Sequence, residues 1–316
     1  MILKHRKEPP DIFQLQSLLK RTPFTYSQFP HWTEQLRRIT AGFHGEQRID
    51  SLWHEIELPF PHFFIHDLFI QKPNSSHQLD TILVTSRFIL ILEIKSISGL
   101  LNFDLQTRQF SRTNKDGSID GMRNPDDQLR RHEKWMQRFL ADQQFELPVI
   151  GAIVFTYPSS VIQSKAGKRI MIHSSGLLYL MEQLFLKYPE DILTGRKTKQ
   201  LALKLAGLHS LQPLELPALP ACFMKGVLCP VCPGLCLTYH RGKWRCSKCV
   251  HVDSLAHLDA LSQYRALVKA TITSSEFREF TGISSRSVAS KMLVHAKMPY
   301  TGSFKDRNYI IPEAFL

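Results

Sequence analysis

The sequence lacks any apolar run that approaches the length of a membrane-spanning helix. Such a helix needs roughly 20 predominantly apolar residues, and polar or charged residues interrupt every apolar stretch of this chain well before that length. The first ten residues also lack the apolar core and the small-residue cleavage site of a signal peptide. We therefore expect a cytoplasmic protein with no membrane partner.

Acidic residues are scarce relative to basic ones. The 316-residue chain has 40 lysines and arginines against 28 aspartates and glutamates, which gives a formal net charge of +12. Residues 221–316 hold 13 basic and 6 acidic residues, so this part carries +7 and the first 220 residues carry the remaining +5. A dense positive charge favours a polyanion as the partner. We expect nucleic acid, and DNA rather than RNA, while a basic protein without such a partner is the alternative.

Cysteine is rare as well, which argues against a dense disulfide framework. Four of the six cysteines form two Cys-x-x-Cys pairs on either side of a basic segment, namely Cys229, Cys232, Cys246 and Cys249. Two such pairs supply four thiolates to one tetrahedral Zn²⁺ ion, with a hairpin between them. We predict a zinc ribbon over residues 225–253. Cys236 is a possible fifth thiol, and a redox-active Cys-x-x-Cys pair is the alternative.

An apolar run from Phe88 to Leu92 ends in the charged sequence Glu93-Ile-Lys95. A short run of this kind is typical of a strand buried on both faces. Residues two apart in a strand share a face, so Glu93 and Lys95 should project together from the strand end. With Asp80 near the preceding strand they would form a site for a divalent cation and a water molecule, since hard cations prefer oxygen ligands. A salt bridge at a strand end is the alternative.

Four short motifs occur in order across about a third of the chain. They are Gly42-Phe-His-Gly45-Glu46, Gln78-Leu-Asp80, Glu93-Ile-Lys95 followed by Gly99, and Asn124-Pro125-Asp-Asp-Gln128. Together they resemble the nuclease-related (NERD) domain over residues 41–156. The resemblance implies a PD-(D/E)xK nuclease fold, although Leu79 stands where that pattern has proline.

The resemblance also implies a metal-dependent nuclease that cleaves phosphodiester bonds in DNA. In this interpretation Asp80 and Glu93 hold Mg²⁺ or Mn²⁺, and Lys95 positions the attacking water. Glu46 and Gln128 assist them. The alternative is a catalytically inactive nuclease fold that serves as a DNA-binding or regulatory protein.

Apolar periodicity predicts an α/β protein with a central mixed sheet flanked by helices. We predict strands at 63–70, 79–85, 88–95 and 148–156, with a further hairpin strand within 100–110. Helices are predicted at 11–21, at 32–39, from Gly45 onward, from Asn124-Pro125 onward, at 174–188 and at 197–208. The basic residues at positions 4–7 are expected to form a solvated end.

The chain is predicted to divide into six parts. These are a helical extension (1–40), the nuclease-related domain (41–156), a helical extension of the core (157–210), a proline-rich linker (211–224), the zinc ribbon (225–253) and an α-helical domain (254–316). In the last part, helical patterns at 274–280 and 285–294 flank a turn at 281–284, which is typical of a helix-turn-helix. A basic hairpin at 300–309 would form a wing.

Basic side chains occur at three places where nucleic acid would bind. Arg130 and Arg131 lie on the outer face of the helix after Pro125 and would line a phosphate backbone. The ribbon adds charge and an aromatic ring suited to stacking on an unpaired base, through Arg241, Lys243, Trp244 and Arg245. The recognition helix would contribute Arg286 and Lys291. For each group the alternative is a solvated surface, or a ribbon that is purely structural.

Overall fold

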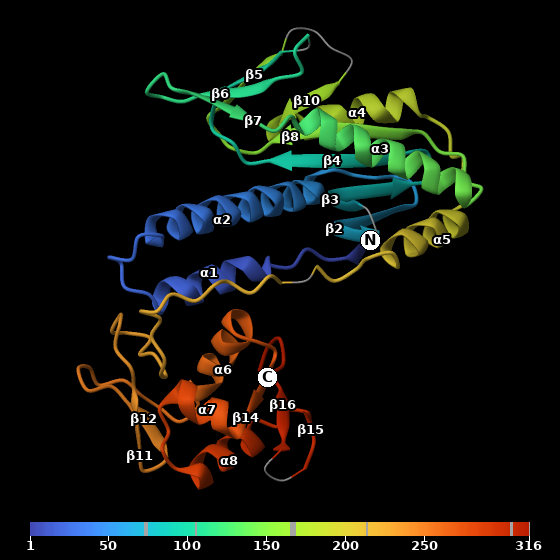
Figure 1. The fold of residues 1–316 in the computed structure, drawn as a ribbon. Helices are drawn as coiled ribbons and strands as arrows, with labels where there is room; N and C mark the ends of the chain where they lie inside the picture. The colour runs from blue at the N-terminus through green and yellow to red at the C-terminus, as the bar shows by residue number, and fades with distance from the viewer. Residues whose placement is uncertain (73–74, 105, 165–168, 213, 304–305, 316) are drawn as a thin grey trace. The chain divides into compact units, whose positions relative to one another are not determined.

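The chain divides into two compact units in the computed structural model, which describes residues 1–72, 75–104, 106–164, 169–212, 214–303 and 306–315 (Figure 1). The first unit comprises residues 1–8 and 41–212, and the second comprises residues 9–40 and 213–316. Within the described ranges, no helix combines the length and apolar character that a membrane crossing requires. The finer division into six parts stays a prediction.

A six-stranded mixed sheet forms the centre of the first unit, in the order β1-β2-β3-β4-β8-β10. Its strands are β1 (Ile2–Lys4), β2 (His62–Lys72), β3 (Ser75–Thr85), β4 (Ile89–Lys95), β8 (Val149–Phe155) and β10 (Ile170–His173). β3 is antiparallel to both β2 and β4, whereas β8 is parallel to β4. The four predicted strands are therefore confirmed, because their apolar runs are buried on both faces of this sheet.

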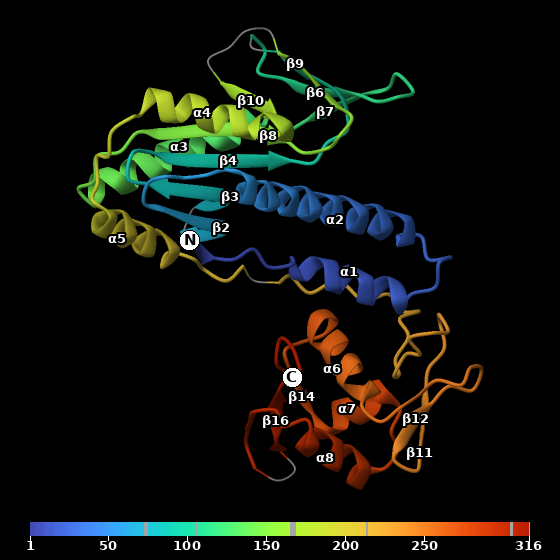
Figure 2. The same ribbon diagram turned by 180° about the vertical axis from the view of Figure 1, so that it is seen from behind.

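Helices cover both faces of the sheet. On one face α3 (Pro125–Asp142) and α5 (Gly195–Ala206) pack on the cluster that contains Ile89 and Ile91 of β4. On the other face, the second half of α2 (Phe29–Leu52) and α4 (Leu177–Lys187) pack on the cluster that contains Leu90 and Leu92. Figure 2 shows α4 beside β8 and β10. The α/β class with helices on both faces of a mixed sheet is thus confirmed.

A second, four-stranded sheet follows the central strand β4, in the order β7-β6-β5-β9. Its strands are β5 (Gly99–Phe103), β6 (Phe110–Thr113), β7 (Ile119–Met122) and β9 (Ser160–Ser164). The hairpin strand predicted within 100–110 is β5, which ends at Phe103 and pairs antiparallel with β6.

A single long helix, α2 (Phe29–Leu52), replaces the two helices predicted at 32–39 and from Gly45. A short 3₁₀ turn, Trp53–Glu55, follows it. The intervening residues include Gly42 but no proline, and one glycine costs a helix only about 1 kcal/mol relative to alanine. Residues up to Thr40 belong to the second unit and those from Ala41 to the first, so α2 continues from one unit into the other.

The second unit joins an N-terminal helix to the last third of the chain. Its elements are α1 (Pro10–Lys20), β11 (Thr238–His240), β12 (Lys243–Arg245), β13 (Val252–Asp253), α6 (Ala256–Leu267), β14 (Thr271–Thr273), α7 (Ser274–Thr281), α8 (Arg286–His295), β15 (Tyr300–Thr301) and β16 (Asn308–Ile310). The strands form two three-stranded sheets, β11-β12-β13 and β14-β16-β15.

A fully buried arginine connects α1 to the rest of this unit. Arg21 follows α1 and donates from Nε to Oε1 of Gln263 on α6, at 2.7 Å. Its Nη1 donates to the carbonyl oxygens of Met224 and Gly226, at 2.8 and 3.0 Å. The guanidinium also lies over the ring of Phe280. Burial lowers the pKa of Arg21 to about 10, so the group stays charged at neutral pH and its hydrogen bonds stabilise the unit.

Candidate functional site

Glu93 and Lys95 lie together at the end of β4, on the face of the sheet that α3 covers. Lys95 Nζ is 2.7 Å from Oε1 of Glu93. The Glu93 side chain is only 1% exposed, whereas that of Lys95 is 27% exposed. The alternation of side chains along a strand explains the shared face. The ammonium group is therefore paired on one side and still accessible to solvent on the other.

Asp80 reaches the same place from the neighbouring strand. Thr81 of β3 pairs with Leu92 of β4, and one step further along both antiparallel strands are Asp80 and Glu93. Oδ2 of Asp80 accepts a hydrogen bond from the backbone N–H of Ile94, at 2.7 Å. This bond holds the carboxylate at the strand end and leaves its other oxygen for a further ligand.

Helix α3 brings two polar side chains over this pair. Its start follows from the sequence, because the Asn124 side chain accepts from the N–H of Asp126 and Pro125 occupies the first turn. Gln128 Oε1 accepts from Lys95 Nζ at 3.4 Å. One turn later, Nδ1 of His132 lies 3.7 Å from Oε2 of Glu93. Neither of these last two atoms has a hydrogen-bond partner among the described residues.

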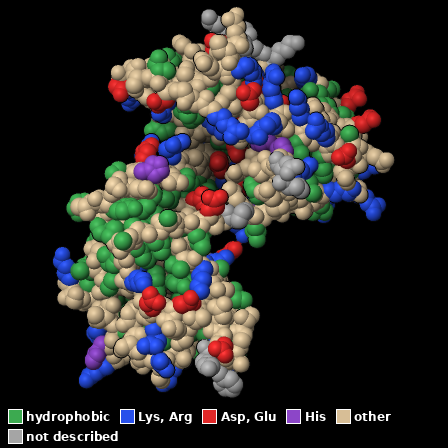
Figure 3. Space-filling model, viewed as in Figure 1, with side chains coloured by type: hydrophobic (Ala, Val, Ile, Leu, Met, Phe, Trp, Pro, Cys, Tyr) green, Lys and Arg blue, Asp and Glu red, His purple; other side chains and the backbone are tan. Residues whose placement is uncertain are grey.

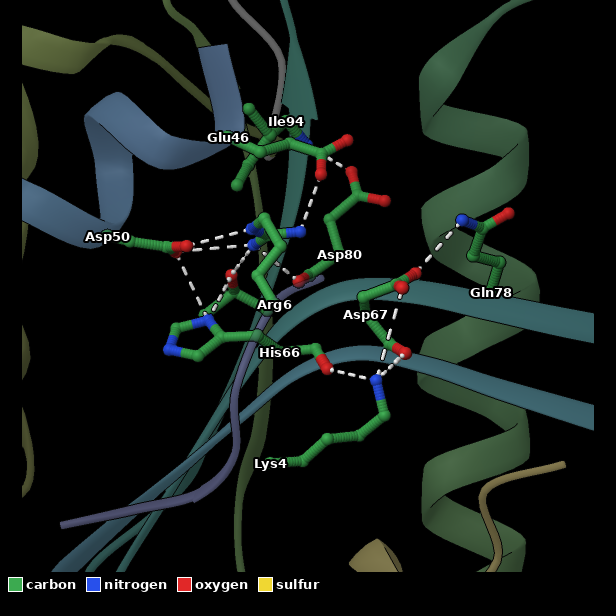
Figure 4. A network of polar contacts seen from close by, with 10 residues as sticks. Lys4, Arg6, Glu46, Asp50, His66, Asp67, Gln78, Asp80 and Ile94 are labelled. Atoms are coloured by element: carbon green, nitrogen blue, oxygen red, sulfur yellow. Dashed lines mark hydrogen bonds and ion pairs between the residues drawn. The ribbon is translucent and has the colours of Figure 1, made fainter. Parts of the chain in front are cut away.

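Glu46 on α2 lies beside Asp80 and is paired with an arginine that the sequence analysis assigned to a solvated end (Figure 4). Arg6 donates from Nη1 to Glu46 and from Nε to Oδ2 of Asp50, at 2.5 and 2.8 Å. Its Nη2 donates to the backbone oxygen of Asp80 at 2.9 Å and to Oγ1 of Thr81 at 3.0 Å. The prediction of a solvated end is therefore wrong for Arg6, whose side chain is 4% exposed.

The short strand β1 explains how Arg6 reaches the site. Ile2 and Lys4 pair in parallel with β2, and Lys4 Nζ donates to the carbonyl oxygens of His66 and Asp67 at 3.0 and 2.7 Å. A three-residue strand has no readable periodicity, and the partners of Arg6 lie 40 to 75 residues away in the sequence. The sequence feature that indicated an ordered segment here was the apolar pair Ile2-Leu3, which precedes the basic residues.

We expect Arg6→Met to lower the free energy of unfolding of the protein by about 3 kcal/mol, because it leaves Glu46 and Asp50 without their buried partner. The matched control is Arg87→Met, which breaks the more exposed pair with Asp191 in the same unit. That change should cost less than about 1 kcal/mol. Chemical denaturation of both variants measures the difference. Equal stabilities for the two variants would contradict a structural role for the Arg6 network.

The carboxylates of this site repel one another in a poorly solvated place. Burial, and next the charge of Asp80, raise the pKa of Glu93 to about 8. The same two causes raise the pKa of Glu46 to about 8 in spite of Arg6. Burial also raises the pKa of Asp80. Burial opposes the charge of Lys95, yet Glu93 and Asp80 raise its pKa above the ordinary value.

A divalent cation fits this donor set. Magnesium and manganese prefer carboxylate oxygens and need only one or two of them. Among the described residues, Oε2 of Glu93 is buried without a hydrogen-bond partner, and burial and the charge of Asp80 both raise the pKa of Glu93. Glu46 is already paired with Arg6, so Asp80 and Glu93 are the residues that would hold the ion.

These pKa values predict opposite pH dependences for the metal-free and metal-bound protein. Between pH 4.5 and 8 the folded protein keeps protons on Glu46 and Glu93 that the unfolded chain has lost, so the free energy of unfolding of the metal-free protein should fall as the pH rises. The affinity for Mn²⁺ should rise over the same range, because the ion must displace these protons. Thermal unfolding and calorimetric titration at pH 5.5, 7 and 8.5 measure both trends, and Glu93→Gln should weaken both. A metal affinity that is independent of pH in the wild type would contradict the assignment.

The two Cys-x-x-Cys pairs of the second unit come together in space. The sulfur atoms of Cys229, Cys232, Cys246 and Cys249 all lie within 4.8 Å of one another. Sγ of Cys229 and Sγ of Cys249 are 3.7 Å apart, which matches the roughly 3.8 Å edge of a tetrahedron with Zn–S bonds of about 2.3 Å. These four residues could therefore hold a metal ion.

Backbone amides prepare one of these thiols for a metal. The N–H groups of Cys249 and Lys248 donate to Sγ of Cys246 and lower its pKa to about 6. Cys236 lies outside the cluster, because its Sγ is directed at the carbonyl oxygen of Lys225 at 3.3 Å. The possible fifth thiol of the sequence analysis is thus not a member of the group of four.

Trp244 does not lie where the sequence analysis expected it. Its side chain is 1% exposed and packs in the core of the second unit, where Nε1 donates to Nδ1 of His257 at 3.4 Å. It is therefore unavailable for stacking on a base. The alternation Lys243-Trp244-Arg245 was the missed signal, because a strand that exposes its two charged residues directs the residue between them inward. Arg241, Lys243 and Arg245 are exposed.

The other predicted nucleic-acid contacts lie on the surface. Arg130 and Arg131 are exposed on α3, where Figure 3 shows Lys and Arg side chains gathered over the helix. In the second unit, Gly282 ends α7 with a φ of 78° and a four-residue turn leads into α8. Arg286 and Lys291 are exposed on α8. Their contact with nucleic acid stays a prediction.

Comparison with protein families identifies the domain in which the acidic site lies. Residues 41–156 match the nuclease-related domain family. The match contains Glu46, Asp80, Glu93, Lys95 and Gln128, whereas Arg6 and the cysteine cluster lie outside it. No curated protein matches the chain significantly.

Proposed function

We propose that the nuclease-related domain of this chain is a metal-dependent nuclease that cleaves phosphodiester bonds in DNA. The observation that carries the proposal is the convergence of Asp80, Glu93 and Lys95 at the end of β4, where Oε2 of Glu93 is buried and has no hydrogen-bond partner in the part of the chain that the structure describes. A buried acid of this kind is expensive unless a cation or a proton neutralises it. This arrangement of charges supports a site that binds an ion and a phosphate.

The chain's own residues would divide the work of hydrolysis. A divalent ion bound to Asp80 and Glu93 would supply a more acidic water and stabilise negative charge on the phosphate. Lys95 has a solvent-accessible ammonium group beside Glu93, so it would orient the attacking water and stabilise charge that develops on the phosphate oxygens. Gln128 holds Lys95 from the helix side. Glu46, which Arg6 holds in position, would add a third carboxylate to the site.

Three positively charged surfaces support nucleic acid as the substrate. Arg130 and Arg131 extend from the helix that also carries Gln128. In the second unit, the exposed residues Arg241, Lys243 and Arg245 lie on the hairpin of β11 and β12, which separates in sequence the two cysteine pairs that we propose hold Zn²⁺. Arg286 and Lys291 are exposed on α8, which we propose is the second helix of a helix-turn-helix with β15 and β16 as its wing. Such units commonly place that helix in the major groove of DNA.

A second function is a nuclease fold that binds DNA without cleaving it. The observation that favours it is the pairing of the acids with chain cations, since Lys95 neutralises Glu93 and Arg6 neutralises Glu46. Charge compensation from within the protein would make the metal dispensable for folding.

A metal-titrated cleavage assay distinguishes the two functions. Plasmid DNA, a single-stranded oligonucleotide and an RNA of the same sequence are incubated with the wild type in EDTA, Mg²⁺ or Mn²⁺. We expect metal-dependent cleavage of DNA by the wild type and none by Asp80→Asn, with the DNA affinity of the two proteins similar. Equal DNA binding without cleavage by either protein, in any metal, would overturn the enzymatic proposal in favour of the binding protein.

A further inference from the structure

A cavity opens on the first unit where α2 approaches the ends of β4 and β8. It has a volume of about 550 Å³, and the residues that line it include His44, Gly45, Arg48, Ser96 and Tyr157. Ser96 directly follows Lys95, and Gly45 directly precedes Glu46. Ligand cavities commonly measure about 300–1,000 Å³, so this one has room for a small molecule or for one residue of a polymer.

Helix α2 presents different residues to the cavity and to the acidic site. Glu46 and Asp50 are four residues apart and both pair with Arg6. His44 and Arg48 are also four residues apart, and both line the cavity. Residues four apart share a helix face, whereas residues two apart do not. The pair His44 and Arg48 therefore lies on a different face of α2 from the pair Glu46 and Asp50. The same turns of α2 therefore build both sites.

Gly45 allows α2 to come this close to the sheet. A Cβ atom at this position would lie 2.4 Å from Oγ1 of Thr156 and 2.8 Å from Cβ of Ser96. Arg48 fastens the contact, because its Nη1 donates to the carbonyl oxygen of Thr156 at 2.5 Å. The N–H of Thr156 in turn donates to the carbonyl oxygen of Lys95, at 3.0 Å. The cavity wall is thus fixed directly to the backbone that carries Lys95.

The chemistry of the lining suits an aromatic anion. Arg48 and His44 are exposed cationic or hydrogen-bonding groups, and Tyr157 presents a ring that is 42% exposed. None of the described residues that line the cavity is acidic. An arginine for phosphate and an aromatic ring for a base are the two elements with which proteins bind unpaired nucleotides.

We infer that this cavity receives one unpaired nucleotide of the substrate strand, with its phosphate at Arg48 and His44 and its base against Tyr157. The inference rests on the proposed nuclease function and makes it more specific. A base held in a duplex cannot enter a cavity of this size without leaving its stack. The enzyme would therefore act on single-stranded DNA, or on a strand with an unpaired nucleotide beside the cleaved bond.

Nucleotide binding in EDTA tests the cavity without requiring cleavage. Deoxyadenosine 5′-monophosphate, deoxyadenosine and inorganic phosphate are titrated separately into the full-length protein by calorimetry. We expect the nucleotide to bind at least about tenfold more tightly than either fragment. Arg48→Gln and Tyr157→Leu should each lose about tenfold in affinity. The matched controls are Arg196→Gln and Tyr179→Leu, which change exposed residues on α5 and α4.

The outcomes separate the cavity from the catalytic proposal. Unchanged affinity in both Arg48→Gln and Tyr157→Leu, with melting temperatures like the wild type, would overturn the inference and leave the nuclease proposal intact. Equal affinity for nucleotide and inorganic phosphate would overturn base recognition. In the cleavage assay, preference for a single-stranded over a duplex oligonucleotide should disappear in Tyr157→Leu, and a wild type that prefers the duplex would also overturn the inference. A wild type that binds the nucleotide but cleaves no DNA would instead defeat the nuclease proposal.

Discussion

Replacing Lys95 by alanine is expected to reduce metal-dependent cleavage by at least 10²- to 10³-fold, the effect of removing one preorganised group that stabilises transition-state charge. Lys95 is the cation at the site that faces both Glu93 and solvent. DNA affinity should change little, because binding would depend on the exposed arginines and lysines of α3 and of the second unit. Single-turnover cleavage and equilibrium binding, measured on the same oligonucleotide, give the two readouts.

The loss of catalysis must be distinguished from a loss of stability, because Lys95→Ala also leaves Glu93 buried without its partner. An unpaired buried charge commonly costs 3–5 kcal/mol, and a variant that unfolds would be inactive for a trivial reason. The double variant Glu93→Gln with Lys95→Met replaces both charges by neutral groups of similar shape, so it should recover stability but no activity. Lys199→Ala, at an exposed position of α5, serves as the neutral control. Cleavage by Lys95→Ala near the wild-type rate would eliminate the catalytic role.

Removal of the metal from the cysteine cluster is expected to unfold the ribbon of the second unit. Structural zinc binding contributes apparent free energies of about 10–16 kcal/mol in small zinc modules, far more than the three short strands of β11-β12-β13 can replace. The purified protein should contain one zinc per chain, and Cys246→Ser should contain none. Because Trp244 belongs to β12 of this ribbon and is buried against His257 of α6, its fluorescence should shift towards that of an exposed indole. Trp244→Phe identifies the contribution of this tryptophan.

Cys236 offers a matched control for the cluster. It lies in the same segment, but its thiol is directed at the Lys225 carbonyl rather than at the four clustered sulfur atoms. Cys236→Ser should therefore retain one zinc and the wild-type fluorescence. Zinc loss in Cys236→Ser together with zinc retention in Cys246→Ser would show that the ligand set is wrong.

Much of the fold could be predicted from local patterns. The strands β2, β3, β4 and β8 are buried apolar runs. Helix α3 begins at Pro125, directly after its capping residue Asn124. These features depend on neighbouring residues, so a window of about ten residues contains the information. The hairpin β5-β6 and the continuity of α2 were predicted less well. A single glycine or a short polar stretch leaves the choice between a break and a continuation to the surrounding packing.

The candidate site was predictable only in part. Strand alternation places Glu93 and Lys95 side by side, and the four motifs pointed to Asp80, Glu46 and Gln128. Arg6 was missed because its position depends on β1 pairing with β2 across more than 60 residues of sequence. The burial of Trp244 was missed because a tryptophan among basic residues indicates a binding surface. In the structure, the alternation of side chains along β12 and the packing against α6 direct the ring inward.

The sequence by itself determined which residues we assign to the candidate sites: the acid and lysine at the end of a buried strand, the two cysteine pairs and the excess of basic charge. These follow from residue type and from spacings of two to four, which fix side-chain direction within one element. Only the tertiary structure decided which distant groups share a site, namely the pairing of Arg6 with Glu46 and the cavity between α2 and the ends of β4 and β8. Contacts of that kind depend on how separate elements pack, and the spacing of residues within one element does not predict them.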